Sequence, residues 1–175
     1  MMDAATLPGL TAAIPVIQTD RLVLRAPALA DLPALTAFFA TPDSHFVGGP
    51  MGAGDTHRAM LATIGSWALY GYGLWHIADK ATDRFVGWTG LLLTPGKSEP
   101  GFAWTVLPAF QGTGLATEAA RAALDHVGDR LGHPAPATYI DSENTASAAV
   151  ARKLGFVAET RNGSELTYRY HRRAA

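Results

Sequence analysis

The stretch Gln111-Gly112-Thr113-Gly114-Leu115-Ala116 constrains this chain most, because it joins an apolar run ending at Pro108 to a strongly helical run. The first turn of a helix has backbone N–H groups without intrahelical acceptors, and the helix dipole adds partial positive charge there. Glycine has no Cβ, so an anion can approach the backbone closely. The loop contains no lysine. The stretch therefore predicts an anion site built from backbone amides, and the alternative is an ordinary surface turn before a helix.

Composition excludes several classes of protein. The chain has 14 Lys+Arg against 15 Asp+Glu, a net charge of −1, which does not favour a partner such as nucleic acid or an anionic membrane. It has no cysteine, so disulfides, thiolate metal sites and a cysteine nucleophile are excluded. The histidines show no HxxxH or HxH spacing, so no metal site is predicted. The first 18 residues lack a positive charge and are interrupted by proline and glycine, which indicates neither a signal peptide nor a spanning helix. A cytoplasmic protein is expected.

Hydrophobic periodicity predicts one α/β domain over residues 19–173, preceded by an N-terminal arm over residues 1–18. Apolar runs predict strands over 19–25, 74–78, 84–93, 102–107, 137–140, 156–159 and 166–171. Apolar residues spaced three and four apart predict helices over 31–40, 55–70, 113–131 and 145–154. Asp55 and Asn144 are expected as N-caps, and Gly155 as the left-handed end of the last helix. The stretch 41–54 is expected to be a flexible loop.

With these motifs and this order of elements, the chain resembles the GNAT N-acetyltransferase superfamily, and most closely the branch of ribosomal-protein alanine N-acetyltransferases. The resemblance covers roughly Asp20 to Tyr170. Three stretches carry it: the glycine loop with its flanks, a second motif about 30 residues further on, and the opening strand. In this sequence they read Leu107-Pro108 through Thr117-Glu118-Ala119, Asn144-Thr145-Ala146-Ser147 through Lys153-Leu154-Gly155-Phe156, and Thr19-Asp20-Arg21-Leu22-Val23-Leu24-Arg25.

The resemblance implies a mixed, mostly antiparallel sheet of about seven strands flanked by about four helices. It also implies acetyl-CoA as the acyl donor. The pyrophosphate would bind the loop amides, with the Thr117 hydroxyl nearby, and the pantetheine arm would enter a gap between two splayed strands. A backbone N–H in the stretch Trp104–Val106 would polarise the thioester carbonyl. The cofactor-binding residues implied are Val106, Leu107, Gln111, Gly112, Thr113, Gly114, Leu115, Ala116, Thr117, Asn144 and Ser147.

The implied reaction is direct attack of a neutral primary amine on the thioester in a ternary complex, which needs a base for the amine and a donor for the departing thiolate. At the position where related enzymes often have a glutamate base, this chain has Gly101, so Glu99, two residues earlier, is the predicted base. The tyrosine that acts as acid in many relatives is replaced by Ala151, and Ser142 is the predicted substitute. His76, between two apolar residues of an expected strand, is interpreted as a packed or edge histidine.

The branch implies a protein N-terminal amine as acceptor, while other relatives acetylate small-molecule amines. His45, Phe46 and the loop Gly48–Gly54 are expected on the acceptor side, because the first two helices and their loop border the acceptor in this superfamily. No nucleic-acid or membrane partner is expected, and the sequence is compatible with a monomer or a homodimer.

Two other functions fit parts of the sequence. Gly101 and Ala151 are compatible with an inactive relative that senses acyl-CoA. A dinucleotide-binding oxidoreductase fits Gly112-x-Gly114 before a helix and a strand ending at Asp141. Against the oxidoreductase, Thr117 stands where the third glycine belongs.

Overall fold

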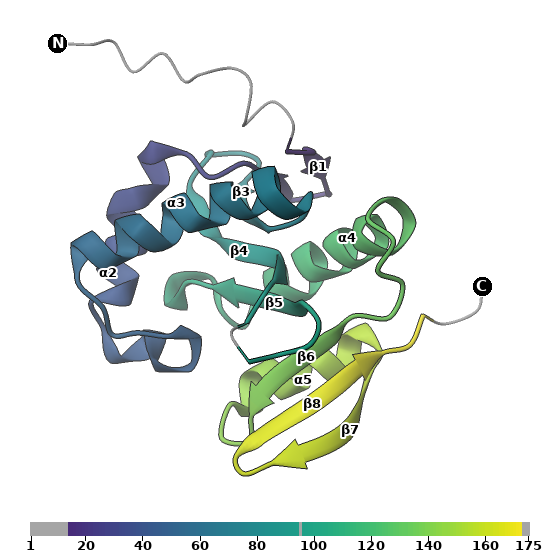
Figure 1. The fold of residues 1–175 in the computed structure, drawn as a ribbon. Coiled ribbons are helices and arrows are strands. Elements are labelled where there is room, and N and C mark those ends of the chain that lie inside the picture. Colours follow the sequence, from purple (N-terminus) through teal and green to yellow (C-terminus); the bar gives the residue numbers. More distant parts are fainter. Residues whose placement is uncertain (1–13, 95, 173–175) are drawn as a thin grey trace, which may run out of the picture.

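The computed structural model describes residues 14–94 and 96–172, and its elements follow one another in the expected order (Figure 1). The strands are β1 (Ile17–Gln18), β2 (Leu22–Arg25), β3 (Leu74–Asp79), β4 (Phe85–Leu92), β5 (Gly101–Val106), β6 (Ala137–Asp141), β7 (Phe156–Asn162) and β8 (Glu165–Tyr170). The α-helices are α2 (Leu32–Phe39), α3 (Ala53–Tyr70), α4 (Leu115–Arg130) and α5 (Thr145–Leu154). Short 3₁₀ turns are η1 (Leu29–Asp31), η2 (Pro42–Val47) and η3 (Pro108–Phe110).

The strands form one sheet in the order β1-β2-β3-β4-β5-β6-β8-β7. Every neighbouring pair is antiparallel except β5 and β6. The mixed, mostly antiparallel sheet is therefore confirmed. The doubly wound fold of dinucleotide-binding enzymes needs a mostly parallel sheet, so this topology excludes that alternative.

The sheet has eight strands rather than about seven, because β1 forms within the stretch expected as an arm. The stretch expected as one strand over 19–25 folds into a turn followed by β2. The Thr19 N–H donates to the Leu22 carbonyl at 2.9 Å, and the Leu22 N–H donates to the Thr19 hydroxyl at 3.0 Å. Residues 14–18 also belong to the domain rather than to an arm. Ile14 is buried, and the Trp75 indole donates to the Pro15 carbonyl at 2.7 Å. The rest of the expected arm, residues 1–13, lies outside the described residues.

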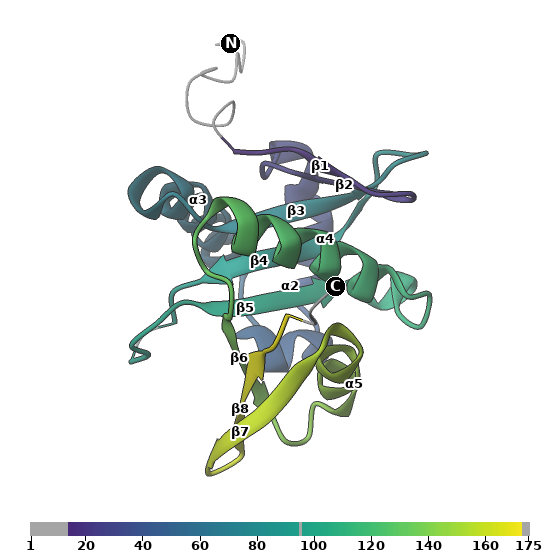
Figure 2. The same ribbon diagram turned by 90° about the vertical axis from the view of Figure 1, so that its right-hand side faces the viewer.

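Helices cover both faces of the sheet. In Figure 2, α4 lies in front of β3 to β5 and α2 lies behind them, while α5 lies beside β7 and β8. The buried alanines of α4, including Ala119, Ala120 and Ala123, let this helix approach the sheet closely. On the opposite face, Phe39 of α2 stacks on Trp88 of β4 with ring centroids 5.6 Å apart. The alternation of side chains along β3 to β5 supplies both cores.

Helix starts differ from expectation at two places. Asp55 is not the N-cap of α3, because Gly52 occupies that position with extended backbone and Asp55 lies in the first turn. The helix α4 begins at Leu115 rather than Thr113, because Gly112 and Gly114 both have positive φ. Two other expectations are confirmed: the Asn144 side chain caps α5, and Gly155 ends it in the left-handed conformation.

The stretch 41–54, expected as a flexible loop, contains η2. Ser44 within it is fully buried and donates to the Thr41 carbonyl at 2.7 Å. In the part of the chain that the structure describes, no helix combines the length and apolar character needed to span a bilayer.

The expected splay lies between β5 and β6. These parallel neighbours are in register at a single pair, Gly101 and Ala137, at the start of both strands. Beyond this pair the two strands diverge, and Figure 2 shows β5 and β6 separating toward the end of β5. The gap therefore opens on the side where β5 leads through η3 into the glycine loop and α4.

Candidate active site

The glycine loop presents a row of open backbone donors. Gly112 and Gly114 adopt φ of 75° and 83°, values that other L-residues rarely take. The N–H groups of residues 112–117 have no hydrogen-bond acceptor within residues 14–94 and 96–172, and the intrahelical ladder is reached only with Glu118, which donates to the Gly114 carbonyl at 3.1 Å. Residues 111–114 are exposed. The expected cradle of amides is therefore present, except that the Gln111 N–H already donates to the Pro108 carbonyl at 3.2 Å.

A basic side chain from a distant strand braces this loop. Arg21, at the start of β2, donates from Nη1 to the Thr113 carbonyl at 3.1 Å and from Nε to Glu118 at 2.7 Å. Glu118 also accepts from the Thr19 hydroxyl at 2.6 Å. Burial raises the pKa of Glu118, but these hydrogen bonds outweigh burial and hold it below its usual value. The sequence did not predict Arg21 at the loop. The one signal for it was that the opening stretch 19–25 and the glycine loop both belong to the same family pattern.

The free edge of β5 offers backbone groups to the gap at alternate residues. Gly87 of β4 faces Val106, and the Leu107 N–H donates to the Val86 carbonyl at 2.8 Å. In an antiparallel pair this register directs the backbone groups of Thr105 toward β4 and those of Trp104 and Val106 away from it, toward the gap. Leu107 was expected to contact the cofactor through its backbone. Both of its groups are already used, since its carbonyl accepts from the Phe110 N–H at 2.9 Å.

Trp104 carries an unpaired donor at the same place. Its side chain is 8% exposed. Its Nε1 is the one buried side-chain nitrogen or oxygen without a hydrogen-bond partner that the described residues contain. Leaving a buried donor unpaired costs about 1–3 kcal/mol, so its presence indicates that an acceptor is supplied from outside the chain. Trp104 lines a cavity between the sheet and the helices α2 and α3.

That cavity has a volume of about 530 Å³. Its walls come from α2, η2 and α3 on one side and from β3 to β6 and the start of α5 on the other. Asn144 and Ser147, expected on the cofactor side, both line it. Phe46, expected on the acceptor side, lines it too, and His45 packs on the Phe46 ring with centroids 3.7 Å apart. A volume of this size suits a small organic molecule.

The predicted residues of the second motif have defined local roles. The Asn144 side chain accepts from the Ser147 N–H at 3.0 Å, which is helix capping. Its amide NH₂ is not used by the cap. Ser142 lies in the turn after β6, where its N–H donates to the Ser164 carbonyl at 2.7 Å. It does not belong to the lining of the cavity, although Asp141 before it does. The roles of these residues toward the cofactor and the thiolate stay predictions.

Gly101, the position of the absent glutamate, faces Tyr139 across the start of the gap. A Cβ at Gly101 would lie 2.9 Å from two atoms of the Tyr139 ring, so this ring occupies the space that a side chain would need. The ammonium of Lys97 lies 4.2 Å from the centre of the same ring. Burial, followed by the charge of Glu99, raises the pKa of Tyr139, so its phenol stays protonated at neutral pH.

Glu99 lies before β5, in a bend, and not on the strand. Arg169 of β8 donates two hydrogen bonds of 2.8 Å to its carboxylate. The same guanidinium lowers the pKa of Glu99. Glu99 does not contribute to the cavity wall. This geometry favours an ion pair that ties the loop to β8, and a role as base stays a prediction.

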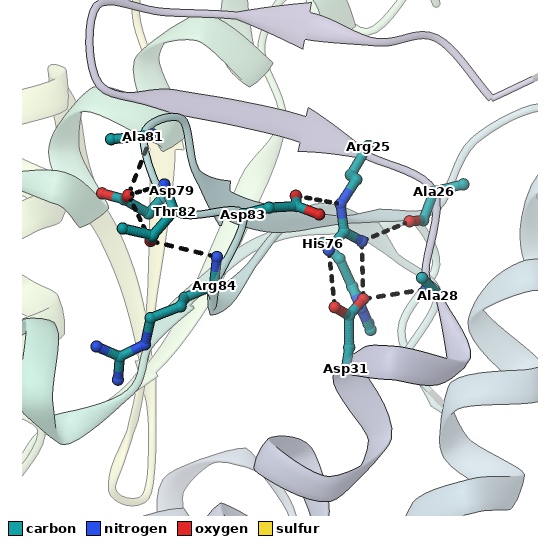
Figure 3. Close-up of polar contacts among 10 residues, drawn as sticks. All are labelled: Arg25, Ala26, Ala28, Asp31, His76, Asp79, Ala81, Thr82, Asp83 and Arg84. Carbon is teal, nitrogen blue, oxygen red and sulfur yellow. Dashed lines mark hydrogen bonds and ion pairs between the residues drawn. The ribbon is translucent and has the colours of Figure 1, made fainter.

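The acceptor side of the cavity contains a buried polar network (Figure 3). His76 of β3 is 3% exposed, and its Nδ1 lies 2.6 Å from Asp31 Oδ2. Arg25 donates two bonds of 2.8 Å to the same carboxylate, and the Ala28 N–H donates a fourth contact at 3.0 Å. Burial raises the pKa of Asp31, but the hydrogen bonds from Arg25, His76 and Ala28 outweigh it and hold that pKa well below its usual value. His76 is packed as expected, and it also lines the cavity.

Comparison with known proteins agrees with this geometry. The acetyltransferase (GNAT) domain family matches residues 21–157. An acetyltransferase from Agrobacterium tumefaciens strain C58 is 33% identical, with 91% of this chain and 95% of that chain covered at a TM-score of 0.83. The structure of RimL, a ribosomal L7/L12 alpha-N-protein acetyltransferase, in complex with coenzyme A shares the fold at 20% identity, with 89% and 97% covered at a TM-score of 0.72.

The uncharacterized protein YkkB of Bacillus subtilis is 37% identical over 90 residues, which are 49% of this chain and 51% of YkkB. The match to this curated relative thus spans about half of its length. The resemblance to ribosomal-protein acetyltransferases is confirmed at the level of the fold. The family match covers most of the domain, including the glycine loop, the parted strands and the capped helix α5. The chain therefore belongs to the acetyltransferase (GNAT) domain family.

Proposed function

We propose that this protein is an N-acetyltransferase that transfers the acetyl group of acetyl-CoA to a primary amine by direct attack in a ternary complex. The observation that carries the proposal is the parting of β5 and β6 after one paired position, next to the row of open amides from Gly112 to Thr117. RimL, which has the same fold, binds coenzyme A. Coenzyme A has a diphosphate that suits open amides at a helix start and an arm with amide groups that suits a free strand edge.

The residues fit this donor without a lysine in the loop. The amides of residues 112–117 would hold the diphosphate, with the dipole of α4 behind them. The backbone groups of Trp104 and the N–H of Val106 would pair with the arm along the edge of β5, since the Val106 carbonyl already accepts from Gln111 Nε2 at 3.2 Å. The unpaired Trp104 Nε1 would find its acceptor on the arm or the thioester. When bound, acetyl-CoA supplies an activated acyl group, and the chain binds it, orients it and shields it from water.

The amine would enter from the side of α2, η2 and α3, where the cavity wall is largely apolar. Such a wall excludes water from the reacting groups and holds the amine toward the gap. A backbone N–H of Trp104 or Val106 would stabilise negative charge on the carbonyl oxygen. Thr105 is not a candidate for this role, because its N–H points toward β4.

Thiol release tests the proposal directly. The purified chain is mixed with acetyl-CoA and, in turn, with an alanine-initiated peptide, spermidine, 2-phenylethylamine and tyramine, and free CoA thiol is measured. We expect at least one amine to accelerate thiol release well above the rate without amine, with the acetylated amine as co-product. Absence of acceleration by every amine, together with measurable acetyl-CoA binding, would contradict transfer.

That second outcome would favour a sensor that binds acyl-CoA without turning it over. One observation supports this candidate: neither position that is catalytic in many relatives carries a reactive group here. Gly101 is covered by the Tyr139 ring, and Ala151 is fully buried in the core. The two functions therefore differ in turnover and not in donor binding.

The Trp104 indole provides a test of donor binding that does not depend on turnover. We expect the Trp104 Nε1–H resonance to move downfield when CoA is added, because the proton gains an acceptor. Trp67 and Trp75 are internal controls, since their indoles already donate to Leu74 and Pro15 carbonyls at 3.1 and 2.7 Å. A titration followed by ¹H–¹⁵N correlation spectra measures all three. A Trp104 resonance that stays in place while CoA binds would contradict the assignment.

Glu99→Gln is expected to lower turnover more than acetyl-CoA affinity, if Glu99 is the base. Because Arg169 lowers the pKa of Glu99, this carboxylate would remain ionised at a lower pH than an ordinary glutamate. Turnover is measured by thiol release and affinity by calorimetry. An unchanged rate with a lower melting temperature would assign Glu99 to its ion pair with Arg169 alone.

A further inference from the structure

We propose that His76 is a specificity-determining residue. Its Nε2 accepts a hydrogen bond from the far end of an acceptor amine that has an apolar body and a hydroxyl or N–H donor roughly 7 Å from the reacting nitrogen, which is two strand spacings less the length of one hydrogen bond. This names a substrate class for the acceptor side and rests on the proposed function. A phenol- or indole-bearing primary amine has this chemistry, whereas a polyamine does not.

The hydrogen bonds of Asp31 set the tautomer of His76. The Asp31 carboxylate is ionised, as its lowered pKa requires, and it accepts from both Nη atoms of Arg25 at 2.8 Å. An ionised carboxylate can only accept, so the His76 Nδ1, 2.6 Å away, must carry the proton. In the neutral ring Nε2 then has a lone pair and is an acceptor. Figure 3 shows the carboxylate between the guanidinium and the imidazole.

Within the described part of the chain, the Nε2 atom is unpartnered and is not sealed from solvent. Nε2 has no hydrogen-bond partner among residues 14–94 and 96–172. Among these residues, Trp104 Nε1 is the one side-chain nitrogen or oxygen that is both unpartnered and fully buried, so His76 Nε2 is not fully buried. His76 belongs to the cavity wall. Its one route to solvent or ligand is therefore the cavity.

The part of the cavity wall formed by α2, η2, α3 and β4 is largely apolar. It includes the large apolar side chains Leu35, Phe39, Val47, Met51, Met60 and Trp88. Thr63 and Ser66 of α3 also line the cavity, but their hydroxyls donate back to the Ala59 and Ala62 carbonyls at 3.1 Å each. An apolar body would bind the wall by burial, and a single donor would be read by Nε2.

The sheet register gives the length of the acceptor. His76 on β3 pairs with Trp88 on β4, which pairs with Thr105 on β5, so these three side chains share one face. Neighbouring strands are about 4.8 Å apart, which puts His76 roughly 10 Å from the edge where the acyl group would lie. An acceptor seated over Trp88 would reach from the edge of β5 to His76. The nitrogen and the donor must then stand at opposite ends of the molecule.

Three charged groups pack around His76. They are Asp31 from η1, Arg25 from β2 and, 3.7 Å beyond the Arg25 Nε, Asp83 from the turn before β4. The Phe85 ring covers the imidazole with centroids 4.8 Å apart. This network holds the imidazole in one orientation. A fixed acceptor is needed to distinguish an amine with a distal hydroxyl from one with a hydrogen at the same position.

Two amines and three variants test the inference. Tyramine and 2-phenylethylamine differ only in the distal hydroxyl. His76→Asn keeps an N–H donor for Asp31 and removes the nitrogen at the Nε2 position, whereas His76→Gln places an amide oxygen or nitrogen near that position. His57→Asn is the matched control, since His57 is an exposed histidine of α3 outside the cavity wall. The readout is the ratio of kcat/KM for tyramine to that for 2-phenylethylamine.

We expect the wild-type ratio to be roughly 10-fold or more in favour of tyramine, as a buried hydrogen bond allows. His76→Asn should bring the ratio to about 1, mainly through a higher KM for tyramine, with His76→Gln in between and His57→Asn at the wild-type ratio. The inference is overturned if wild type and His76→Asn have equal ratios, or if wild type shows no preference for tyramine. In either case, transfer to one of the two amines still upholds the proposed function.

A binding measurement covers the case of a protein without turnover or a variant that does not fold. In wild-type protein saturated with CoA, the imidazole resonances of His76 should shift on addition of tyramine and not of 2-phenylethylamine. Mutation of the other histidines one at a time identifies the resonances. A shift without turnover upholds recognition of the distal hydroxyl by His76 and overturns the proposed function; no shift with either amine overturns the inference.

Discussion

Gly114→Glu is expected to abolish acetyl-CoA binding, lowering affinity by at least roughly 100-fold, while the chain stays folded. Gly114 is the residue before the first turn of α4, and its N–H is one of the open donors of the loop. A carboxylate placed there would add a negative charge beside the proposed diphosphate site, with its Cβ 3.6 Å from Arg21 Nη2. Two like charges about 4 Å apart repel by about 4 kcal/mol at the effective dielectric of a protein surface. Calorimetric titration with acetyl-CoA measures the loss, and circular dichroism confirms the fold.

Two control variants separate repulsion from backbone strain. Gly114 has φ of 83°, so any side chain costs about 1–2 kcal/mol of conformational energy. Gly114→Gln has the same strain and nearly the same shape without the charge, and it should lose less affinity. Gly163→Glu, in the turn between β7 and β8 with φ of 62° and open space around it, should leave affinity unchanged. Normal affinity of Gly114→Glu would refute the loop as the diphosphate site.

Asp31→Ala is expected to lower the free energy of unfolding by about 3–5 kcal/mol, the cost of breaking one partner out of a buried ion pair. Asp31 is 2% exposed and joins η1 to β2 and β3 through Arg25 and His76. Its removal leaves a buried guanidinium without its carboxylate. Denaturant unfolding measures the difference. Asp83→Ala is the matched control, because Asp83 meets the same Arg25 at 3.7 Å but its side chain is 86% exposed, so it should cost less than about 1 kcal/mol.

The same carboxylate predicts how stability depends on pH. The pKa of Asp31 is lowered in the folded chain, so the unfolded chain binds the proton more readily. The stabilisation by Asp31 is therefore complete above the ordinary carboxyl value of 3.8 and is lost as pH falls from there toward the lower folded value. The stability gap between wild type and Asp31→Ala should be constant near neutral pH and close in strong acid. A gap that closed between pH 5 and pH 7 would contradict this account.

Local sequence patterns determined most elements, because helices and strands depend on contacts between residues a few positions apart. The spacing of apolar residues predicted α2 to α5 within a few residues, and Asn144 and Gly155 predicted both ends of α5. The predicted boundaries were wrong where the same local pattern fits two different structures. Asp55 suits both a cap and a first turn, and Gly52 took the cap. The stretch 19–25 alternates like a strand, but the Thr19 side chain closes a turn inside it.

The glycine loop was also readable from sequence, because open amides follow from glycine at positive φ before a helix. What the tertiary structure alone decided is which distant side chains meet. Arg21 braces the loop through Glu118, which is 97 positions away in the sequence. Arg169 holds Glu99 across 70 positions. Asp31 orients His76 across 45 positions. Pairing partners across a sheet or between a strand and a helix are set by topology and register, which local spacing does not encode. The loop of the proposed diphosphate site is thus predictable from local sequence, whereas the strand gap and the proposed acceptor site depend on the formed sheet.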